Sequence, residues 1–445
     1  MMNIGNTVVA ELEDFAVSIN GDSERTYVEL DGVEYPNFRA PYSRQEIESA
    51  LNDYAPDRPS TDPLSSIGST LFNALFSGEV GRTLWRRMAE AERKGAGLRL
   101  RIRSNLERTQ HLPWELLFDP SRNDFISLSG RVAIVRTRPD QLVPKDVMDA
   151  LPQLRVLAVT ADFTGELRTN EDLAILQRFA AQHPDRMVLT ILDQASPELL
   201  RKRLSSETFD VFHFAGSGVV LPEISKRGGI RQALQLMNIA GSRSNNATTT
   251  EIGVSAGITP LLDRQELGKL LKKAGVRLAV LNACHTDWIA RSVAKYIPSV
   301  IGFREIVRIE SCLTFCDALY RPILAGAALD TSVTTARQAM NRLHPGLNDW
   351  CKIIFYLQQP TGAFLLAAVA QANAVEAVAS PGESKEVLKL TRLLELHERN
   401  LAVLNQNLAS APGIETYSTQ VDEVQRKADD VRQQLAAARA PSGTD

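Results

Sequence analysis

The middle of the chain alternates strand-like and helix-like segments, and this alternation constrains the fold more than any other feature. Helical segments follow the first two apolar runs, over 170–182 and from Ser196 onward. Strand, helix, strand, helix in succession predicts a doubly wound, mostly parallel α/β sheet with helices on its faces. The apolar and β-branched runs that we expect to form its buried strands lie at 154–162, 187–193, 209–216, 276–284 and 299–303.

Capping residues indicate where two of these helices begin. Ser196 is a favoured N-cap residue, and Pro197 after it suits the first helical position. Asp263 and Glu266 have the spacing of a capping box before the segment ELGKLLKKAG. These signals predict helices that start directly after Ser196 and Asp263.

The first 150 residues form a region that we expect to be mostly β with some helix. Asp31-Gly32 is a hairpin turn signal inside an alternating segment. Residues 69–94 have helical spacing, whereas LRLRIRSN at 98–105 alternates as a half-buried strand does. Pro113 is well placed to open a short helix in the segment HLPWELLFDP.

Two segments fall outside this pattern. Residues 219–262 are a long, partly polar insertion between the third and fourth strands, and we expect a mobile, functional loop there. After a linker at 377–386, apolar residues at helical spacing predict a helical hairpin. We therefore divide the chain into an α/β region at 1–150, a sheet domain at 151–376 and the hairpin at 384–440.

Composition argues against several classes of protein. With 50 basic and 53 acidic residues the net charge is -3, which argues against a dedicated nucleic-acid binder. No apolar run reaches the roughly 18 residues that a membrane span needs. The first residues, MMNIGNTVVAELEDF, do not have a signal-peptide pattern, so we expect a cytoplasmic protein. Four cysteines are too few for a disulfide framework, and we expect Cys312 and Cys316 to pack on one helix face rather than bind a metal.

Two strand ends carry residues with chemical potential, and chemistry in a parallel sheet gathers beyond the carboxyl ends of its strands. The segment VFHFAGSG (211–218) runs into what we interpret as a glycine-lined bend that contains Ser217. The next strand along the chain ends at Cys284, whose thiol could act as a nucleophile if a base took its proton. Position alone also fits a small, buried apolar residue.

Several segments in order resemble the CHAT family, which are caspase-like cysteine peptidases related to separases and gingipains. The resemblance covers about residues 70–365 and implies a caspase-like fold with cysteine peptidase chemistry that requires no cofactor. The similar segments are LPWELLFD (112–119), FHFAGSG (212–218), VLNACHT (280–286), IPSVIGF (297–303) and FCDALYRPILAGAALDTSVTTAR (315–337).

The resemblance places Cys284 at the nucleophile position and Ser217 where the family has its catalytic histidine. A serine hydroxyl cannot take the thiol proton at neutral pH. His213 matches the family's non-catalytic histidine and lies four residues, roughly 13 Å, from Ser217 on the same strand. His285 follows Cys284 directly, but neighbouring strand side chains point apart. His213 and His285 are therefore secondary candidates for the missing base.

The two glycines beside Ser217, Gly216 and Gly218, are assigned to the cleft or oxyanion site, and no residue is assigned as a metal ligand. Three interpretations stay open. The chain is a degenerate CHAT domain that binds or signals, an active peptidase with a substitute base or second subunit, or an engineered inactive form. The last predicts that Ser217→His restores cleavage.

The predicted hairpin at 384–440 resembles coupling hairpins beside effector domains in bacterial defence and NTPase-linked systems. This resemblance implies a protein substrate, or an adaptor or NTPase partner that activates the chain through the hairpin. Self-packing or dimerisation of the hairpin, which would make a homo-oligomer, is the alternative. We expect neither a membrane nor a nucleic acid as partner.

Overall fold

The structure is a computed structural model of the 445-residue chain. The chain divides into two compact units, Met1–Ala368 and Val369–Asp445. The described residues of the second unit are helical, but most of the predicted hairpin and its linker lie outside the described residues. The structure describes residues 12–21, 25–52, 63–138, 140, 149–162, 165–222, 230–235, 261–359, 366, 425–426, 429–430, 432–434 and 436.

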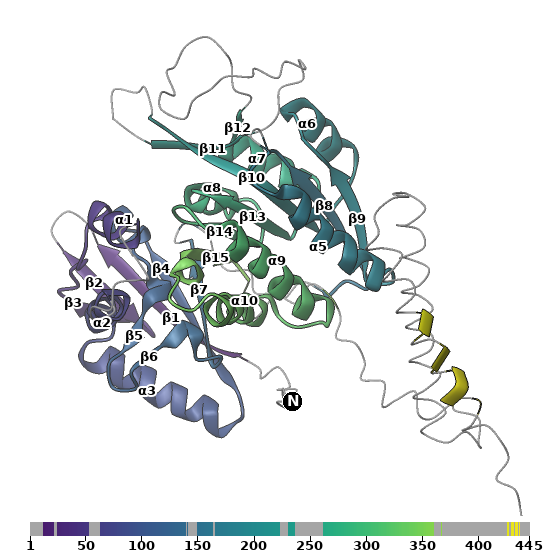
Figure 1. The fold of residues 1–445 in the computed structure, drawn as a ribbon. Coiled ribbons are helices and arrows are strands. Elements are labelled where there is room, and N and C mark those ends of the chain that lie inside the picture. Colours follow the sequence, from purple (N-terminus) through teal and green to yellow (C-terminus); the bar gives the residue numbers. More distant parts are fainter. Residues whose placement is uncertain are drawn as a thin grey trace, which may run out of the picture. The chain divides into compact units, whose positions relative to one another are not determined.

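One sheet of 13 strands runs through the described part of the first unit (Figure 1). A separate two-stranded sheet is formed by β5 (Phe118–Asp119) and β6 (Asp124–Phe125). The strands of the large sheet are β1 (Leu12–Gly21), β2 (Thr26–Leu30), β3 (Val33–Pro36), β4 (Gly97–Ser104), β7 (Val132–Thr137), β8 (Leu154–Thr160), β9 (Met187–Leu192), β10 (Val211–Pro222), β11 (Ile230–Gln235), β12 (Leu261–Asp263), β13 (Leu278–Cys284), β14 (Ser299–Phe303) and β15 (Ile353–Leu357).

The large sheet consists of two parallel blocks that run in opposite directions. β9, β8, β10, β13 and β14 lie side by side and are parallel. β15 is antiparallel to β14 and parallel to β7, β4 and β1, which follow it in the sheet. The hairpin β2–β3 closes one edge, and β11 with β12 extends the other beside the far end of β10. The mostly parallel α/β fold that the alternation predicts is confirmed.

Helices cover both faces of the first block, and two apolar cores lie beneath them. Figure 1 shows α5 and α9 in front of β10 and β13, whereas α6, α7 and α8 lie on the opposite face. Ser196 and Asp263 accept hydrogen bonds at the starts of α6 and α7, as the capping signals predict. The helices are α1 (Arg44–Asn52), α2 (Pro63–Leu75), α3 (Gly78–Arg93), α4 (Glu107–Gln110), η1 (Trp114–Leu116), η2 (Ile126–Leu128), α5 (Thr169–Gln182), α6 (Pro197–Ser206), α7 (Arg264–Lys273), α8 (Asp287–Val293), α9 (Ile309–Leu324), α10 (Leu329–Leu343) and η3 (Asp349–Lys352).

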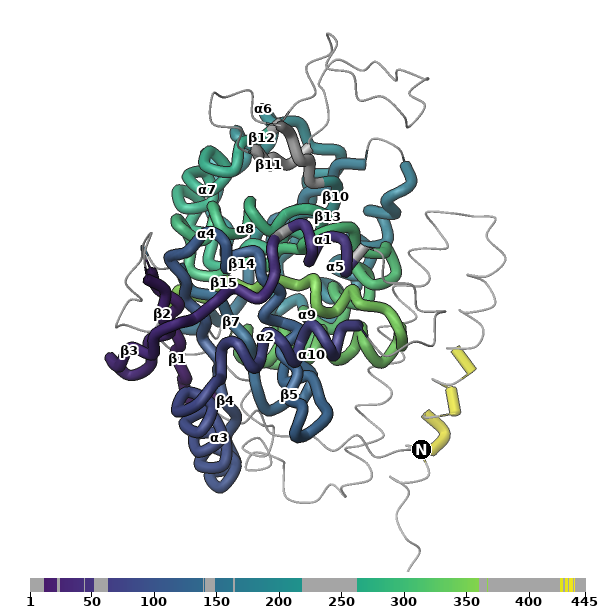
Figure 2. Tube along the Cα trace, turned by 90° about the vertical axis from the view of Figure 1, so that its left-hand side faces the viewer, coloured from purple at the N-terminus to yellow at the C-terminus, as the bar shows by residue number. Residues whose placement is uncertain are grey.

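The N-terminal region follows the sequence pattern with two exceptions. The Asp31-Gly32 turn joins β2 to β3, and both residues have positive φ, as the hairpin signal predicts. The helical segment 69–94 is two helices rather than one, because the chain turns at Gly78, whose φ of +57° lies outside the α-helical region. α2 and α3 lie near β4 in Figure 2.

The prediction of a strand at residues 98–105 is confirmed, but the prediction that this strand is half-buried is wrong. β4 is buried along almost its whole length, and its arginines Arg99 and Arg101 are 3% and 4% exposed. Arg99 donates hydrogen bonds to Asp330 on α10 and to Asp14 on β1. The arginines that alternate with apolar residues along β4 therefore form buried ion pairs, because a guanidinium can be buried when carboxylates pair with it.

The interpretation of Gly216–Gly218 as a bend is also wrong. β10 continues through these residues to Pro222, and Gly218 pairs with Leu234 of β11. The predicted loop 219–262 therefore contains strand where the structure describes it, because β11 and β12 give this part of β10 a hydrogen-bonding partner. Residues 223–229 and 236–260 lie outside the described residues.

Among the described residues, no helix is long and apolar enough to cross a membrane.

Candidate functional site around Cys284

Cys284 and Ser217 lie side by side on two parallel strands, at the point where β13 ends and β10 continues. Cys284 is the last residue of β13, and its register partner on β10 is Ser217. Neighbouring strands lie about 4.8 Å apart, and paired residues in a parallel ladder project to the same face. A side chain at position 217 therefore lies next to the Cys284 thiol. Two segments that are 67 positions apart in the sequence thus contribute to one site.

The face that carries this pair is the one covered by α5 and α9. Side chains alternate along a strand, so His213, Ala215 and Ser217 share a face of β10. Their partners on β13 are Val280, Asn282 and Cys284. His213 contacts both helices, through Asp172 on α5 and Tyr320 on α9.

The Cys284 thiol is mostly buried and is held by the chain that follows β14. The backbone N–H of Val307 donates to Cys284 Sγ at 3.4 Å, and Sγ lies 3.8 Å from the Val307 carbonyl oxygen. Burial raises the pKa of this thiol above its ordinary value, and the Val307 N–H and the Lys352 charge lower it less strongly. The thiol is therefore protonated at neutral pH, and a protonated thiol is a weak nucleophile.

Buried polar groups of η3 hold the segment that carries Val307 in place. Lys352 donates one hydrogen bond to the Ile306 carbonyl oxygen at 2.7 Å and another to Asp349 at 3.0 Å. Asp349 also accepts from Ser311 at 2.8 Å and from Arg308. Burial alone would raise the pKa of Asp349, but Lys352 and these donors lower it below its usual value. An ionised Asp349 thus ties η3 to the start of α9.

A pocket of about 50 Å³ adjoins the thiol. It is bounded by the middle of β10, by the end of β13, by the start of α5 and by the first turn of α9. Its lining residues are Leu167, Arg168, Thr169, Asp172, Ala215, Gly216, Asn282, Ala283, Cys284, Val307, Ile309, Cys312 and Leu313.

Beneath the pocket lies a chain of buried hydrogen bonds. His213 is 0% exposed, and its Nε2 lies 2.5 Å from Asp172 Oδ2 while its Nδ1 lies 3.1 Å from the Tyr320 hydroxyl. Asn282 Nδ2 donates to the other Asp172 oxygen at 3.1 Å. His213 is thus committed to the interior, which agrees with its interpretation as a structural residue.

The same cluster contains a set of groups that could ligate a metal, which sequence spacing did not reveal. Ligand atoms of Asp172, His213 and Cys316 lie within 4.8 Å of one another. The Cys316 thiol hydrogen-bonds to Asp172, and burial raises its pKa well above the ordinary value. Because each ligand atom already engages a protein group, the arrangement matches a hydrogen-bond network. Only tertiary packing brings α5, β10 and α9 together here, so spacing along the chain carried no signal.

The remaining predicted site residues occupy different places around the pair. Gly216 lines the pocket, and a Cβ there would come within 2.7 Å of the Ala161 carbonyl oxygen. Gly218 lies in the part of β10 that pairs with β11. His285 has a positive φ of 53°, and its backbone N–H donates to the Glu305 carbonyl oxygen at 3.2 Å. Burial raises the pKa of Glu305, and the charge of His285 lowers it less strongly.

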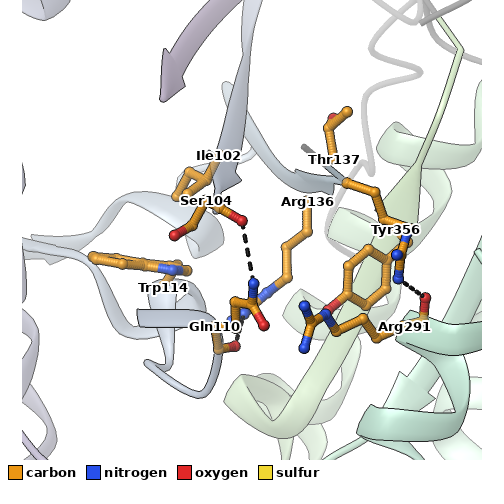
Figure 3. Close-up of a pocket in the computed structure, with 9 residues that line it drawn as sticks. Ile102, Ser104, Gln110, Trp114, Arg136, Thr137, Arg291 and Tyr356 are labelled. Atoms are coloured by element: carbon orange, nitrogen blue, oxygen red, sulfur yellow. Dashed lines mark hydrogen bonds between the residues drawn. The ribbon is translucent and has the colours of Figure 1, made fainter. Parts of the chain in front are cut away.

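A second pocket lies at the ends of β4 and β7 and shares no lining residue with the first (Figure 3). Its volume of about 20 Å³ has room for one or two water molecules. Arg136 reaches past it to the Gln110 carbonyl oxygen at 2.8 Å and to Glu115. Figure 3 shows Arg291 and Tyr356 side by side on the opposite wall. This pocket is small and belongs to the structural cluster around Glu115.

Comparisons with known proteins match most of this chain to one family. The sequence model of the CHAT domain matches residues 67–356, well over half of the chain. Similar solved structures are two crystal structures of the Saccharomyces cerevisiae separase-securin complex, at 3.0 and 2.6 Å resolution, with 12% and 11% identity and TM-scores of 0.33 and 0.34. Each match covers 74% of this chain but only 20% of the other chain. No curated protein matches the sequence.

Proposed function

This chain belongs to the CHAT family, and on that premise we propose that it is a caspase-like protein that binds polypeptide at Cys284 without cleaving it. The observation that carries the proposal is the register pairing of Cys284 with Ser217. The nucleophile position is present, and the neighbouring position holds a hydroxyl that cannot act as a general base at neutral pH.

The surroundings of the thiol support this proposal. An active cysteine nucleophile needs a lowered pKa or an adjacent base. Burial instead raises the pKa of Cys284, and the charges that act on it come from Lys352 and Asp349. His213 is committed to Asp172 and Tyr320, and the His285 backbone N–H donates to the Glu305 carbonyl oxygen.

An effector role in a bacterial signalling or defence system is part of this proposal, with a partner protein recruited through residues 384–440. The resemblance of that segment to coupling hairpins supports it. In this role the chain would sequester or present a protein segment when its partner binds.

The test is to place an imidazole opposite the thiol and to measure how fast Cys284 is alkylated. In the unchanged chain the reaction with iodoacetamide should be slow at pH 7 and should rise only above the ordinary thiol range, because the pKa is raised. Ser217→His should accelerate alkylation at pH 7 by about tenfold or more, which corresponds to one pKa unit. Mass spectrometry of the Cys284 peptide reports the rate.

Ser217→Gln is the matched control, because it adds polar bulk without a titratable group. Ser217→His should also cleave members of a peptide library, and the double variant with Cys284→Ala should not. Equal alkylation rates for the histidine and glutamine variants would contradict the assignment of position 217. Cleavage by the unchanged chain that Cys284→Ala abolishes would instead show an active peptidase with another base.

A further inference from the structure

The large sheet has three open edges among the described strands, and β9 is the edge that carries no protection. Figure 1 shows β9 beside β8 at the end of the first parallel block. β12 has only three residues, while β3 has four and carries Glu34 and Pro36. Short length, charge and proline keep edge strands from pairing with other chains. β9 has six residues, MVLTIL, with neither a charge nor a proline, so it can pair with a further strand.

The backbone of β9 offers pairing groups at this edge. The Leu154 N–H donates to the Arg186 carbonyl oxygen at 2.8 Å, immediately before β9. Alternate residues of a strand in a parallel ladder bond to the same neighbour, so the even-numbered residues of β9 bond to β8. Leu189 and Ile191 therefore direct their N–H and C=O groups away from β8, where the described part of the chain places no other strand.

Apolar side chains flank the same edge. Five large apolar side chains are strongly exposed in the described residues, and two of them are Val188 on β9 and Leu199 on α6, at 45% and 48%. Side chains alternate along a strand, so Leu192 lies on the same face as Val188 and packs partly against the core beneath α6. Exposed apolar groups on and beside one open edge indicate an interaction surface.

A second copy of the chain fits this edge, because β9 is complementary to itself. A two-fold axis through Thr190, perpendicular to the sheet, would pair two β9 strands antiparallel and keep each face of the sheet on its own side. Leu189 then lies opposite Ile191 of the second copy, and the outward N–H and C=O groups of both residues bond to each other. On the α6 face, Val188 lies opposite Leu192 of the second copy. The positions within two residues of Thr190 thus pair apolar side chains with apolar side chains.

Neighbouring registers are less favourable, which fixes the axis at Thr190. An axis at Leu189 would place Asp185 opposite Asp193 of the second copy, and like charges opposite each other destabilise a sheet. An axis at Ile191 would place Asp193 opposite Leu189. A foreign strand would require no such symmetry within MVLTIL, so the pattern favours a second copy. Closed two-fold dimers are also the commonest assemblies of identical chains.

We propose that two copies of this chain pair through β9, antiparallel and centred on Thr190, so that their sheets form one continuous sheet across a two-fold axis. The partner of this edge is thus the same chain. β9 contributes no residue to the pocket beside Cys284, so this assembly is separate from the function proposed above.

Sedimentation velocity of the full, unchanged chain over about a hundredfold range of concentration should show a monomer–dimer equilibrium that shifts to dimer as the concentration rises. Val188→Lys should raise the dimer dissociation constant by about tenfold or more, because the ammonium would lie opposite Leu192 without a partner. Val33→Lys is the matched control, since Val33 is a half-exposed valine on the other edge strand β3. This control should change the dissociation constant by less than about twofold, because a lysine on an unpaired edge meets only water.

Thr190→Lys and Thr190→Glu test the position of the axis. Each variant places two like charges opposite each other, so each should be monomeric at concentrations at which the unchanged chain is dimeric. An equal mixture of the two should dimerise, because opposite charges then face each other across the axis. Dimerisation on mixing also shows that both variants are folded.

A full chain that stays monomeric at every concentration overturns the proposal and needs no variant to fold. A dimer that persists in Val188→Lys also overturns it, because the contact then lies elsewhere, for example in residues 384–440. If the mixture of the two Thr190 variants stays monomeric while Val188→Lys dissociates the dimer, the register centred on Thr190 is wrong.

Discussion

At the scale of single residues, Glu115 is a buried carboxylate surrounded by arginines. It is 1% exposed, and both of its carboxylate oxygens accept from Arg136, at 3.0 and 2.7 Å. Burial alone would raise the pKa of Glu115, but Arg136, Arg304 and Arg337 outweigh it and hold the pKa below its usual value. Arg304 follows β14 and donates to the Leu112 carbonyl oxygen. The LPWELLFD segment, which contains η1, is therefore a structural centre that is linked to Arg304 at the end of β14, the strand next to β13.

Glu115→Gln should destabilise the protein by about 3–5 kcal/mol, because it leaves buried guanidinium charge uncompensated. The lowered pKa contributes stability above the carboxyl's unfolded value, and that stability disappears as the pH falls through the folded value. The unchanged chain should therefore lose stability more steeply than the variant as the pH falls below about 4.3. Urea denaturation across this pH range measures both effects.

Glu79→Gln is the control for this change, because the Glu79–Arg82 pair is exposed and should contribute less than about 1 kcal/mol. A loss of under 1 kcal/mol in Glu115→Gln would mean that the arginines find other partners and that the cluster is not coupled to folding.

At the scale of elements, the local sequence pattern predicted where the buried strands lie, but it did not predict that β10 continues past Gly216. The apolar run at 209–216 marks the first half of β10, because burial between two helical layers demands apolar side chains. The second half contains Gly216, Ser217 and Gly218, whose strand conformation depends on β11. β11 is separated from β10 in the sequence by residues with no local strand signal. No local pattern could therefore indicate that the two segments pair.

The site shows the same division between local and tertiary information. Cys284 and position 217 were singled out from their motifs, and in the structure they are register partners on β13 and β10. Asp172 on α5, which accepts a hydrogen bond from Asn282, was not predicted. Its role arises from how α5 lies across the sheet, which a helical periodicity does not encode.

Close approach of β8 and β10 requires glycine at position 216. A Cβ on Gly216 would lie 2.7 Å from the Ala161 carbonyl oxygen and 2.7 Å from the buried Phe214 ring. Gly216→Ala should therefore cost about 1–3 kcal/mol of stability, as overpacking does, and should change the alkylation rate of Cys284. Thermal unfolding and the alkylation assay measure these two effects.

Gly268→Ala is the matched control, because a Cβ there would also overpack, against the Tyr296 ring, but on α7, which covers the opposite face of the sheet from Cys284. We expect this variant to lose a similar amount of stability, about 1–3 kcal/mol, and to keep the alkylation rate of Cys284. If Gly216→Ala is neutral, the two strands can separate without cost and the glycine is not needed for packing.

At the scale of the whole molecule, the first unit contains the complete site and both apolar cores. The described residues of the two cores lie between Phe15 and Leu366. Segments from α5, β10, β13 and α9 build the pocket, while η3 and the LPWELLFD segment hold the chain that covers the thiol. Binding at Cys284 is therefore a property of the first unit in this proposal, and residues beyond it serve recruitment.

A chain that ends at Ala368 should fold and should keep the Cys284 alkylation rate of the full chain, with a melting temperature within about 2 °C, which is roughly 1 kcal/mol or less for a unit of this size. A chain that ends at Pro360 is the sharper comparison, because it also removes Leu366, which is 0% exposed and bridges to Leu151. Loss of a buried leucine costs about 2–5 kcal/mol, so the shorter chain should melt several degrees lower. If the chain ending at Ala368 is as unstable as the shorter one, residues 369–445 contribute to folding, and their proposed role would have to include stabilising the site.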